Sequence, residues 1–143
     1  MDERFYRQIV EGSPDAIIMG DAEGIIRLWN AGAESIFGFA AAEALGHSMD
    51  IIIPERLRSR HWDGYRNVVA SGRTRYGKGD LLAVPAIRKD GNAISVEFTI
   101  QILMDEQRNL VGLVAIIRDV TKRFLREKMM AQRLRELSGE AKP

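Results

Sequence analysis

One segment of the chain alternates strictly between apolar and polar side chains, from residue 94 to residue 102. Its apolar positions are Ile94, Val96, Phe98, Ile100 and Ile102, and the positions between them are Ser95, Glu97, Thr99 and Gln101. Because successive side chains of a strand point to opposite faces of a sheet, this period of two predicts a strand with one face turned to a core. The chain is therefore expected to build a sheet that is covered on one face.

Further strands are predicted from short apolar runs on both sides of this segment. They are Ala16–Met19, Ile25–Trp29, Leu81–Val84 and Leu110–Ile117. Polar turns join several of them, including Asp21-Ala22-Glu23-Gly24, Arg88-Lys89-Asp90-Gly91 and residues 105–109. Such short connections favour antiparallel neighbours, because parallel strands need a long crossover.

Helices are predicted before, between and after these strands. Phe5, Tyr6, Ile9 and Val10 share one face at helical spacing, and Asn30 is a preferred N-cap for a short helix. A second helical face covers residues 55–70 and ends at Ser71-Gly72, and Lys122–Leu137 contains no Gly or Pro. The order of elements predicts one α+β domain, an antiparallel sheet with helices on a single face.

The stretch from Ser13 to Glu55 resembles the front half of a PAS domain of the S-box type. The matching positions are Pro14-Asp15-Ala16, Asp21, Gly24, Trp29-Asn30, Ala33-Glu34, Phe37-Gly38, Glu43, Gly46 and Pro54-Glu55. Later, residues 88–91 are similar to the turn before the family's fourth strand, and residues 118–121 to its exit motif. The resemblance implies a PAS fold with sheet order 2-1-5-4-3. It divides the chain into a flanking helix (1–11), a PAS domain (12–121) and a signalling or coiled-coil helix with its tail (122–143).

Composition narrows the chemistry of the chain. It has no cysteine, which excludes disulfides, thiolate catalysis and the cysteinyl adduct of light-sensing flavin PAS domains, while non-covalent flavin stays open. The net charge of +1 gives no field that gathers nucleic acid or acidic lipid. No apolar run approaches the roughly 20 residues of a membrane span. With no nucleophile, metal or phosphate motif, we expect a soluble, cytoplasmic protein that is not an enzyme.

The family resemblance implies a sensory and dimerisation module of bacterial-type signal transduction. Its output would be a domain or partner such as a histidine kinase of a two-component system, a cyclase or a transcription factor. The signal would leave through Asp119 and Thr121 into the helix from Lys122, although both residues are also natural N-caps. Whether the chain is complete or part of a longer protein stays open.

A homodimer is expected from the two flanking helices. The candidate interface residues are Phe5, Ile9, Phe124, Leu134 and Leu137. The C-terminal helix holds fewer than three heptads, so it would gain from a partner. The alternative is a solvated helix that packs on its own domain. Segment 118–137 has a net charge of +4 but no interleaved aromatic residues, so a nucleic-acid site is not expected there.

A ligand pocket is expected between the sheet and segment 51–69. Its candidate lining is Ile18, Ile51, Ile53, Leu57, His61, Val68, Leu82, Phe98, Ile100 and Ile116. The same residues would form an ordinary core if the domain is a ligand-free structural homodimer module. A polar and aromatic cluster of Trp62, Tyr65, Arg73, Arg75 and Tyr76 would either ring the mouth of the pocket or pack on the surface.

Residues 54–61 are similar to the segment of oxygen-sensing heme PAS kinases that ends in the iron ligand. Counting forward from Pro54 places His61 at the ligand position, which implies a heme-based gas or redox sensor. Counting back from the Asp63-Gly64-Tyr65 motif places Trp62 there instead. The family's oxygen-binding arginine is absent from residues 79–82. The alternative is a His61 that only packs against the sheet.

Overall fold

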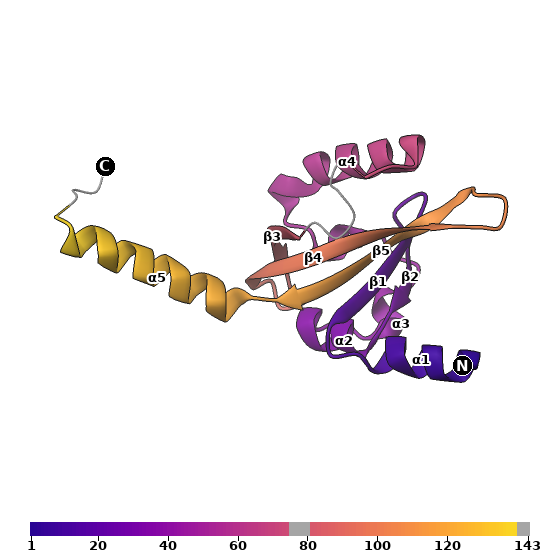
Figure 1. Cartoon of the computed structure of the whole chain (residues 1–143), viewed down its shortest axis with the longest axis horizontal. Helices are drawn as coiled ribbons and strands as arrows, with labels where there is room; N and C mark the ends of the chain where they lie inside the picture. Colours follow the sequence, from indigo (N-terminus) through magenta and orange to yellow (C-terminus); the bar gives the residue numbers. More distant parts are fainter. Residues whose placement is uncertain (75–80, 140–143) are drawn as a thin grey trace.

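The computed structural model describes residues 1–74 and 81–139, which form a five-stranded antiparallel sheet. The strands are β1 (Ala16–Asp21), β2 (Ile26–Trp29), β3 (Leu82–Ile87), β4 (Ala93–Met104) and β5 (Leu110–Asp119). Their order is β2-β1-β5-β4-β3, so the last strand of the chain lies at the centre (Figure 1). The predicted sheet and its strand order are confirmed.

The helices lie between β2 and β3 and at the two ends of the chain. They are α1 (Glu3–Gly12), α2 (Ala31–Phe37), α3 (Ala41–Ala44), the 3-10 helices η1 (Met49–Ile52) and η2 (Glu55–Leu57), α4 (Arg58–Ser71) and α5 (Thr121–Leu137). Helix α4 ends where the sequence predicted, because Gly72 takes a left-handed conformation (φ 68°) and its N–H bonds to the Val68 carbonyl at 2.8 Å.

The register of the strands assigns each side chain to a face of the sheet. Ala115 of β5 pairs with Ile18 of β1 and with Ile100 of β4, so these three share one face. This inner face packs against α2, α3, η1 and α4 in a single buried cluster that includes Phe37 and Tyr65. The outer face carries its own apolar residues, which include Ile17, Met19, Leu28, Val114 and Ile116.

Strand β3 differs from its prediction. The sequence predicted Leu81–Val84, whereas the strand spans Leu82–Ile87 and contains Pro85. Proline has no N–H for a ladder hydrogen bond, so it argues against a central strand but is tolerated at an edge. β3 is the edge strand, paired with β4 alone.

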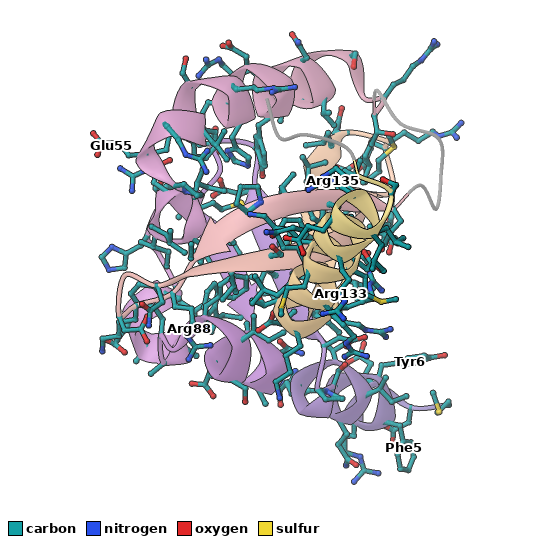
Figure 2. The ribbon with its side chains drawn as sticks, turned by 90° about the vertical axis from the view of Figure 1, so that its left-hand side faces the viewer. Phe5, Tyr6, Glu55, Arg88, Arg133 and Arg135 are labelled. Atoms are coloured by element: carbon teal, nitrogen blue, oxygen red, sulfur yellow. The ribbon has the colours of Figure 1, made fainter. Side chains whose placement is uncertain are left out.

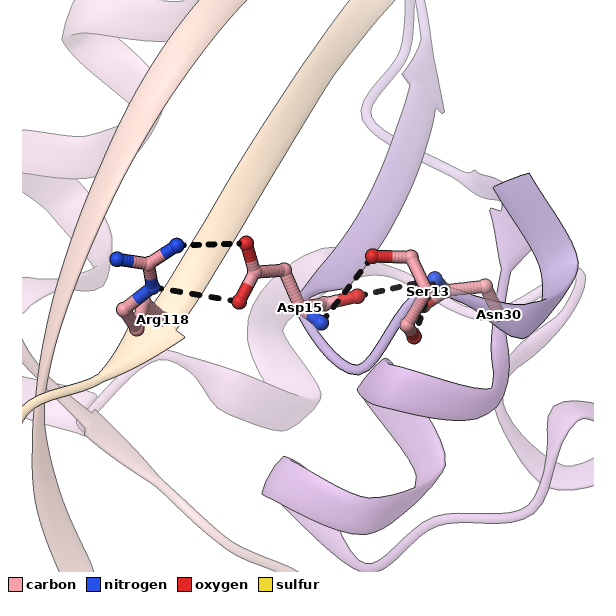
Figure 3. A network of polar contacts seen from close by, with 4 residues as sticks. All are labelled: Ser13, Asp15, Asn30 and Arg118. Atoms are coloured by element: carbon pink, nitrogen blue, oxygen red, sulfur yellow. Dashed lines mark hydrogen bonds and ion pairs between the residues drawn. The ribbon is translucent and has the colours of Figure 1, made fainter. Parts of the chain in front are cut away.

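Asn30 joins three elements, which goes beyond its predicted role as N-cap of α2. Its Oδ1 accepts hydrogen bonds from the N–H groups of Ala33 (2.9 Å) and Ile17 (2.8 Å). Its Nδ2 donates to the carbonyls of Val10 (2.8 Å) and Asp15 (3.0 Å). Through these bonds the buried, saturated amide joins α1, β1 and α2. Figure 3 shows Asn30 beside Ser13 and Asp15.

The two flanking helices differ in how they meet the domain. Helix α1 contacts α2, and α5 leaves the end of β5 and projects away from the body (Figure 1). Neither helix contains a buried residue. Among the described residues, no helix is both long enough and apolar enough to cross a bilayer.

Candidate functional site

The inner face of the sheet beneath α4 brings together most of the predicted pocket residues. Ile18 is fully buried, and eight others are half-buried: Ile51, Ile53, Leu57, His61, Val68, Leu82, Phe98 and Ile100. Most of these apolar side chains pack against the buried core cluster. Nine of the ten predicted residues are thus at least partly buried, and one is not.

Ile116 is the exception, and its predicted placement is corrected. It pairs with Ile17 and Thr99 on the outer face, and it is 42% exposed. The predicted run for β5 is continuously apolar, so no alternation of polar and apolar residues shows which side chains point to the inner face. The inner-face residues of β5 are Leu113, Ala115 and Ile117.

Burial is uneven across the inner face. Ala16 and Ile18 of β1 are completely buried, whereas Phe98 and Ile100 of β4 retain solvent exposure although their face is the one turned to the helices. A tightly packed core leaves such side chains with little contact with water. Phe98 and Ile100 of β4, together with Val84 of β3 (42% exposed), are thus apolar side chains of the inner face that are left to contact something else.

His61 lies on α4 in a group of three aromatic rings. Its ring centre is 4.7 Å from that of Trp62 and 5.8 Å from that of Tyr65. Its Nδ1 is buried and has no hydrogen-bond partner within residues 1–74 and 81–139. Burial lowers the pKa of His61, against the opposing charge of Asp50, so the ring is neutral at pH 7. A neutral, half-buried imidazole can donate a lone pair to a metal ion.

Trp62 has a different role from the neighbouring histidine. Its Nε1 donates a hydrogen bond to Oδ1 of Asp50 at 2.7 Å. Its ring packs on the β1–β2 turn at Gly24, where an added Cβ would lie 2.1 Å from the indole. The sequence motifs place either His61 or Trp62 at the position of the iron ligand. Trp62 is already used in a hydrogen bond and in packing. A nitrogen of His61, in contrast, lacks a partner among the described residues.

Tyr65 is a site residue whose anchoring role the sequence did not show. Its hydroxyl donates a hydrogen bond to the carbonyl of Asp21 at 2.7 Å and so ties α4 to the end of β1. Gly20 makes room for this contact, because a Cβ there would lie 2.6 Å from the hydroxyl. Burial, together with the charges of Asp21 and Glu23, raises the pKa of Tyr65. The phenol therefore remains a hydrogen-bond donor at neutral pH.

The edge of the sheet at β3, where the predicted pocket would end, is apolar in the described residues. Leu82 pairs with Phe98 at the edge of the sheet, and Leu81 is exposed. Residues 79 and 80 of the segment compared with the heme family, and Arg75 and Tyr76 of the predicted aromatic cluster, lie outside the described residues. A heme would therefore find an imidazole from α4 and apolar walls from β4, but no arginine at Leu82.

Two surface hollows lie away from this lining. One is an open groove lined by Pro54, Glu55, Arg56, Arg58 and Ile87. The other lies at Phe37, Gly38, Arg88, Lys89 and Asp90, where the Arg88 guanidinium donates to the Ile36 carbonyl. Figure 2 shows Glu55 and Arg88 on the same side of the molecule. Neither hollow contains a residue of the predicted pocket. Within the described ranges, no group of three His, Asp or Glu side chains is placed to hold a metal ion.

The predicted signal-exit residues, Asp119 and Thr121, form a small hydrogen-bond network between β5, β4 and α5. Oδ1 of Asp119 accepts from the Thr121 N–H (2.9 Å) and hydroxyl (2.5 Å). The Thr121 hydroxyl oxygen in turn accepts from the Ser95 N–H at 3.0 Å. The Val120 N–H donates to the Ser95 carbonyl at 2.8 Å. The start of α5 is thus tied to β4, which the capping role alone did not predict.

The candidate dimer residues are all solvent-exposed in the single chain. They are Phe5 and Ile9 on α1, and Phe124, Leu134 and Leu137 on α5. Figure 2 shows Phe5 and Tyr6 turned away from the body at the end of α1. Both flanking helices therefore present apolar side chains that their own domain does not cover.

Comparison with known proteins places this geometry among sensory domains. A family model described as the PAS fold matches residues 4–120. The sensor protein FixL of Bradyrhizobium diazoefficiens is 32% identical over 139 residues, which is 96% of this chain and 26% of FixL. The oxygen sensor protein DosP of Escherichia coli K12 is 23% identical over 131 residues, 92% of this chain and 16% of DosP. The chain thus spans about a quarter or less of the length of these two relatives.

Solved structures agree on the fold. A PAS domain of a protein from Colwellia psychrerythraea superposes with a TM-score of 0.72 at 22% identity, covering 84% of this chain and 98% of that one. A structure described as an RNA-binding light-oxygen-voltage receptor gives a TM-score of 0.73 at 21% identity, covering 91% of this chain and 36% of that one.

Proposed function

The chain belongs to the PAS family, and we propose that it is the sensory module of a longer signalling protein. In this proposal a ligand on the inner face of the sheet changes β4, and β4 passes the change to α5. The observation that carries the proposal is the double role of β4. Its Phe98 and Ile100 are half-buried under α4, while Ser95 at its start holds the first residues of α5.

The ligand half of the proposal rests on the partly exposed apolar surface of β4. Burying apolar surface is worth about 25 cal/mol per Å², so a small apolar or mixed ligand would gain free energy by covering it. Tyr65 and Trp62 would stay out of the binding step, because their polar atoms already bind Asp21 and Asp50. The module would bind and transmit rather than catalyse.

A filling variant tests the ligand half. Ile100→Trp places a large side chain on the inner face, whereas Thr99→Trp places the same side chain on the outer face of the same strand. The probe is the dye 8-anilinonaphthalene-1-sulfonate, whose fluorescence rises on apolar surfaces. We expect Ile100→Trp to lose dye binding and Thr99→Trp to keep it. Equal binding by both variants would contradict an inner-face site.

The proposed transmission to α5 rests on the hydrogen-bond network at residues 119–121. The N-cap of α5 is Val120 and not one of the two predicted residues, while Asp119 accepts both hydrogen bonds from Thr121. If Asp119 is also a hinge, Asp119→Ala should reduce output in a full-length protein while leaving the melting temperature nearly unchanged. Parallel loss of output and stability would leave Asp119 with only a structural role, through its hydrogen bonds to Thr121. The output domain would be of the kind that sensor proteins carry, such as a histidine kinase of a two-component system, a cyclase or a transcription factor.

We further propose that the working unit is a homodimer in the cytoplasm, held by the two flanking helices. The exposed apolar residues of α1 and α5 support this arrangement, since an isolated helix of this length is marginal in water. Such helices are stabilised when apolar stripes from two chains pack together. A ligand-free dimerisation module would share this interface but would show no dye binding on the inner face.

A heme-based gas sensor is the second candidate function, and His61 is the observation that favours it. The half-buried ring is neutral and has an unpartnered nitrogen, and the relative DosP is named an oxygen sensor. His61 would hold the iron from α4, and Phe98 and Ile100 would pack against the macrocycle. A bound heme would supply a visible, gas-sensitive iron centre.

The absorption spectrum decides between the two candidates. Purified chain is titrated with hemin, reduced with dithionite to the ferrous state, and measured before and after carbon monoxide. His61→Ala and the exposed-histidine control His47→Ala are treated in the same way. A sharp band that moves with carbon monoxide and disappears only in His61→Ala would establish the heme sensor. A diffuse band that is the same in all three proteins would leave a colourless ligand.

A further inference from the structure

Arg123, in the first turn of α5, binds a carboxylate on the body of the domain and lies near a second one on its own helix. It forms an ion pair with Glu97 of β4, and its Nε lies 3.7 Å from Oε1 of Glu127. We propose that Arg123 is a positioning residue that fixes the direction of α5 while it binds Glu97, and frees the helix when it moves to Glu127. This inference rests on the proposed transmission through β4.

Glu97 depends on Arg123 because the arginine that faces it across the β4–β5 ladder already binds another carboxylate. Arg118 stands directly across from Glu97 in the β4–β5 register. However, its guanidinium binds both carboxylate oxygens of Asp15, at 3.1 and 3.3 Å (Figure 3). The Glu97 side chain is only 16% exposed, so its charge is poorly solvated. A largely buried carboxylate needs a partner far more than a surface one does.

Because Arg123 lies beyond the first residue of α5, its ion pair with Glu97 can fix the direction of the helix. The other ties of α5 to β4 run from Val120 and Thr121 to Ser95, at the first residue of the helix, and they act as a pivot. Arg123 adds a contact further along the helix, which fixes the rotation and tilt that a pivot leaves free. α5 is 17 residues long, or ~25 Å, so a tilt of about 10° at its base moves its last turn by roughly 4 Å.

Helix stability does not explain an arginine at this position. A cation in the first turn opposes the helix dipole, which favours negative side chains there. An i,i+4 pair with the cation on the N-terminal side is also the weaker of the two orientations. Arg123 thus weakens the start of α5 slightly and is compensated by Glu97. Glu127 provides a second, weaker partner, so release from Glu97 does not leave the guanidinium unpaired.

A change at the inner face of the sheet can affect the Glu97–Arg123 ion pair through β4 itself. Glu97 lies between Val96 and Phe98, which point to the inner face of the same strand. Val96 is fixed in the core, whereas Phe98 retains exposure toward the proposed ligand site. A displacement of β4 at Phe98 therefore moves the Glu97 carboxylate relative to the pivot at Ser95.

Distance measurement between two spin labels tests the proposal. The chain has no cysteine, so Glu106→Cys in the β4–β5 turn and Lys128→Cys on α5 can be labelled selectively. Labelled protein is diluted into unlabelled full chain, which isolates the distance within one chain. The variants are Glu97→Gln, Arg123→Gln, the double variant and the control Glu127→Gln. Melting temperatures confirm that each variant is folded.

We expect a narrow distribution for the starting protein and for Glu127→Gln. Glu97→Gln and Arg123→Gln should each lose the narrow peak, and the double variant should be no broader than either single variant. An unchanged peak in both single variants, or equal broadening in Glu127→Gln, would overturn the proposal. No ligand or output domain takes part, so failure here leaves the proposed sensory function standing. Conversely, an Ile100→Trp variant that leaves α5 unmoved would count against transmission and not against the Glu97–Arg123 contact.

Discussion

A single side chain can make hydrogen bonds to several elements that the sequence pattern does not predict, and Asn30 is the clearest example. All the hydrogen-bonding groups of its buried amide are used, on three elements. Its role as N-cap was predictable from residue type, because asparagine before a helical segment is a common cap. Its bonds to α1 and β1 were not predictable, since they depend on which segments the fold brings together.

Replacing Asn30 should therefore cost more than a cap alone. Asn30→Ala removes the cap of α2 and leaves the N–H of Ile17 and the carbonyls of Val10 and Asp15 without this partner. We expect a loss of about 2–4 kcal/mol in unfolding free energy, measured by urea denaturation. Asn67→Ala, at an exposed position of α4, should change stability by less than about 0.5 kcal/mol. Equal effects of the two variants would contradict the account of Asn30.

His61 should make stability depend on pH in the mildly acidic range. Its pKa in the folded protein is lowered below 6.5 by burial, so the unfolded chain binds a proton more readily. Stability is then complete above about pH 7 and falls as the pH drops below about 6.5, by at most about 1.4 kcal/mol per pH unit. His61→Gln should flatten this slope, while His47→Gln should keep it. A slope that persists in His61→Gln would assign it to another group.

Protonation of Asp21 should lower the stability of the fold at a more acidic pH than protonation of His61 does. Burial acts to raise the pKa of Asp21, but hydrogen bonds from the Ile25 N–H, Arg27 and the Glu23 N–H outweigh it and lower the pKa overall. The Asp21 carboxylate thus stabilises the fold above its unfolded pKa, and this contribution is lost as the pH falls through the lowered value. The two groups act in different pH windows, so the His61 test is not obscured.

Among the elements, the alternating strand β4 was predictable and the faces of β5 were not. Polar residues in β4 mark its outer face, whereas every residue of the run that the sequence offered for β5 is apolar or glycine. Sequence reasoning therefore placed Phe98 and Ile100 correctly on the inner face but assigned Ile116 to the same face. Counting by twos from a residue known to pair inward, such as Ile117, would have corrected it.

The junction between β4 and α5 allows a test at the level of elements. Thr121→Val removes the hydroxyl that accepts from the Ser95 N–H, whereas Thr121→Ser keeps it. We expect Thr121→Val to lose about 1 kcal/mol and to speed amide exchange at Ser95, with little change in Thr121→Ser. Exchange at Ser95 that is equally fast in both variants would mean that the hydroxyl does not tie α5 to β4.

For the whole molecule, self-association is expected to depend on both flanking helices. Removal of residues 1–11 or 122–143 takes away exposed apolar side chains and none of the buried apolar cluster. The first truncation also removes the Val10 carbonyl from Asn30, and the second removes Arg123 from Glu97, so melting temperatures must confirm that each is folded. Sedimentation equilibrium should then show a dimer for the full chain and a weaker dimer or a monomer for each truncation. A full chain that stays monomeric at high micromolar concentration would contradict this arrangement. The sequence predicted a helix at each end of the chain. The partner surface that we propose for them would belong to a second chain, and neither helix alone encodes it.

The central claim is that occupancy of the inner face moves α5, and a filling variant tests it most directly. The labelled pair at positions 106 and 128 is measured in Ile100→Trp and in the outer-face control Thr99→Trp, with no ligand added. The account predicts a shifted or broadened distance in Ile100→Trp, because its side chain presses β4 from the inner face, and an unchanged distance in Thr99→Trp. Identical distances in the two variants would contradict the claim that β4 carries a signal from the inner face to α5.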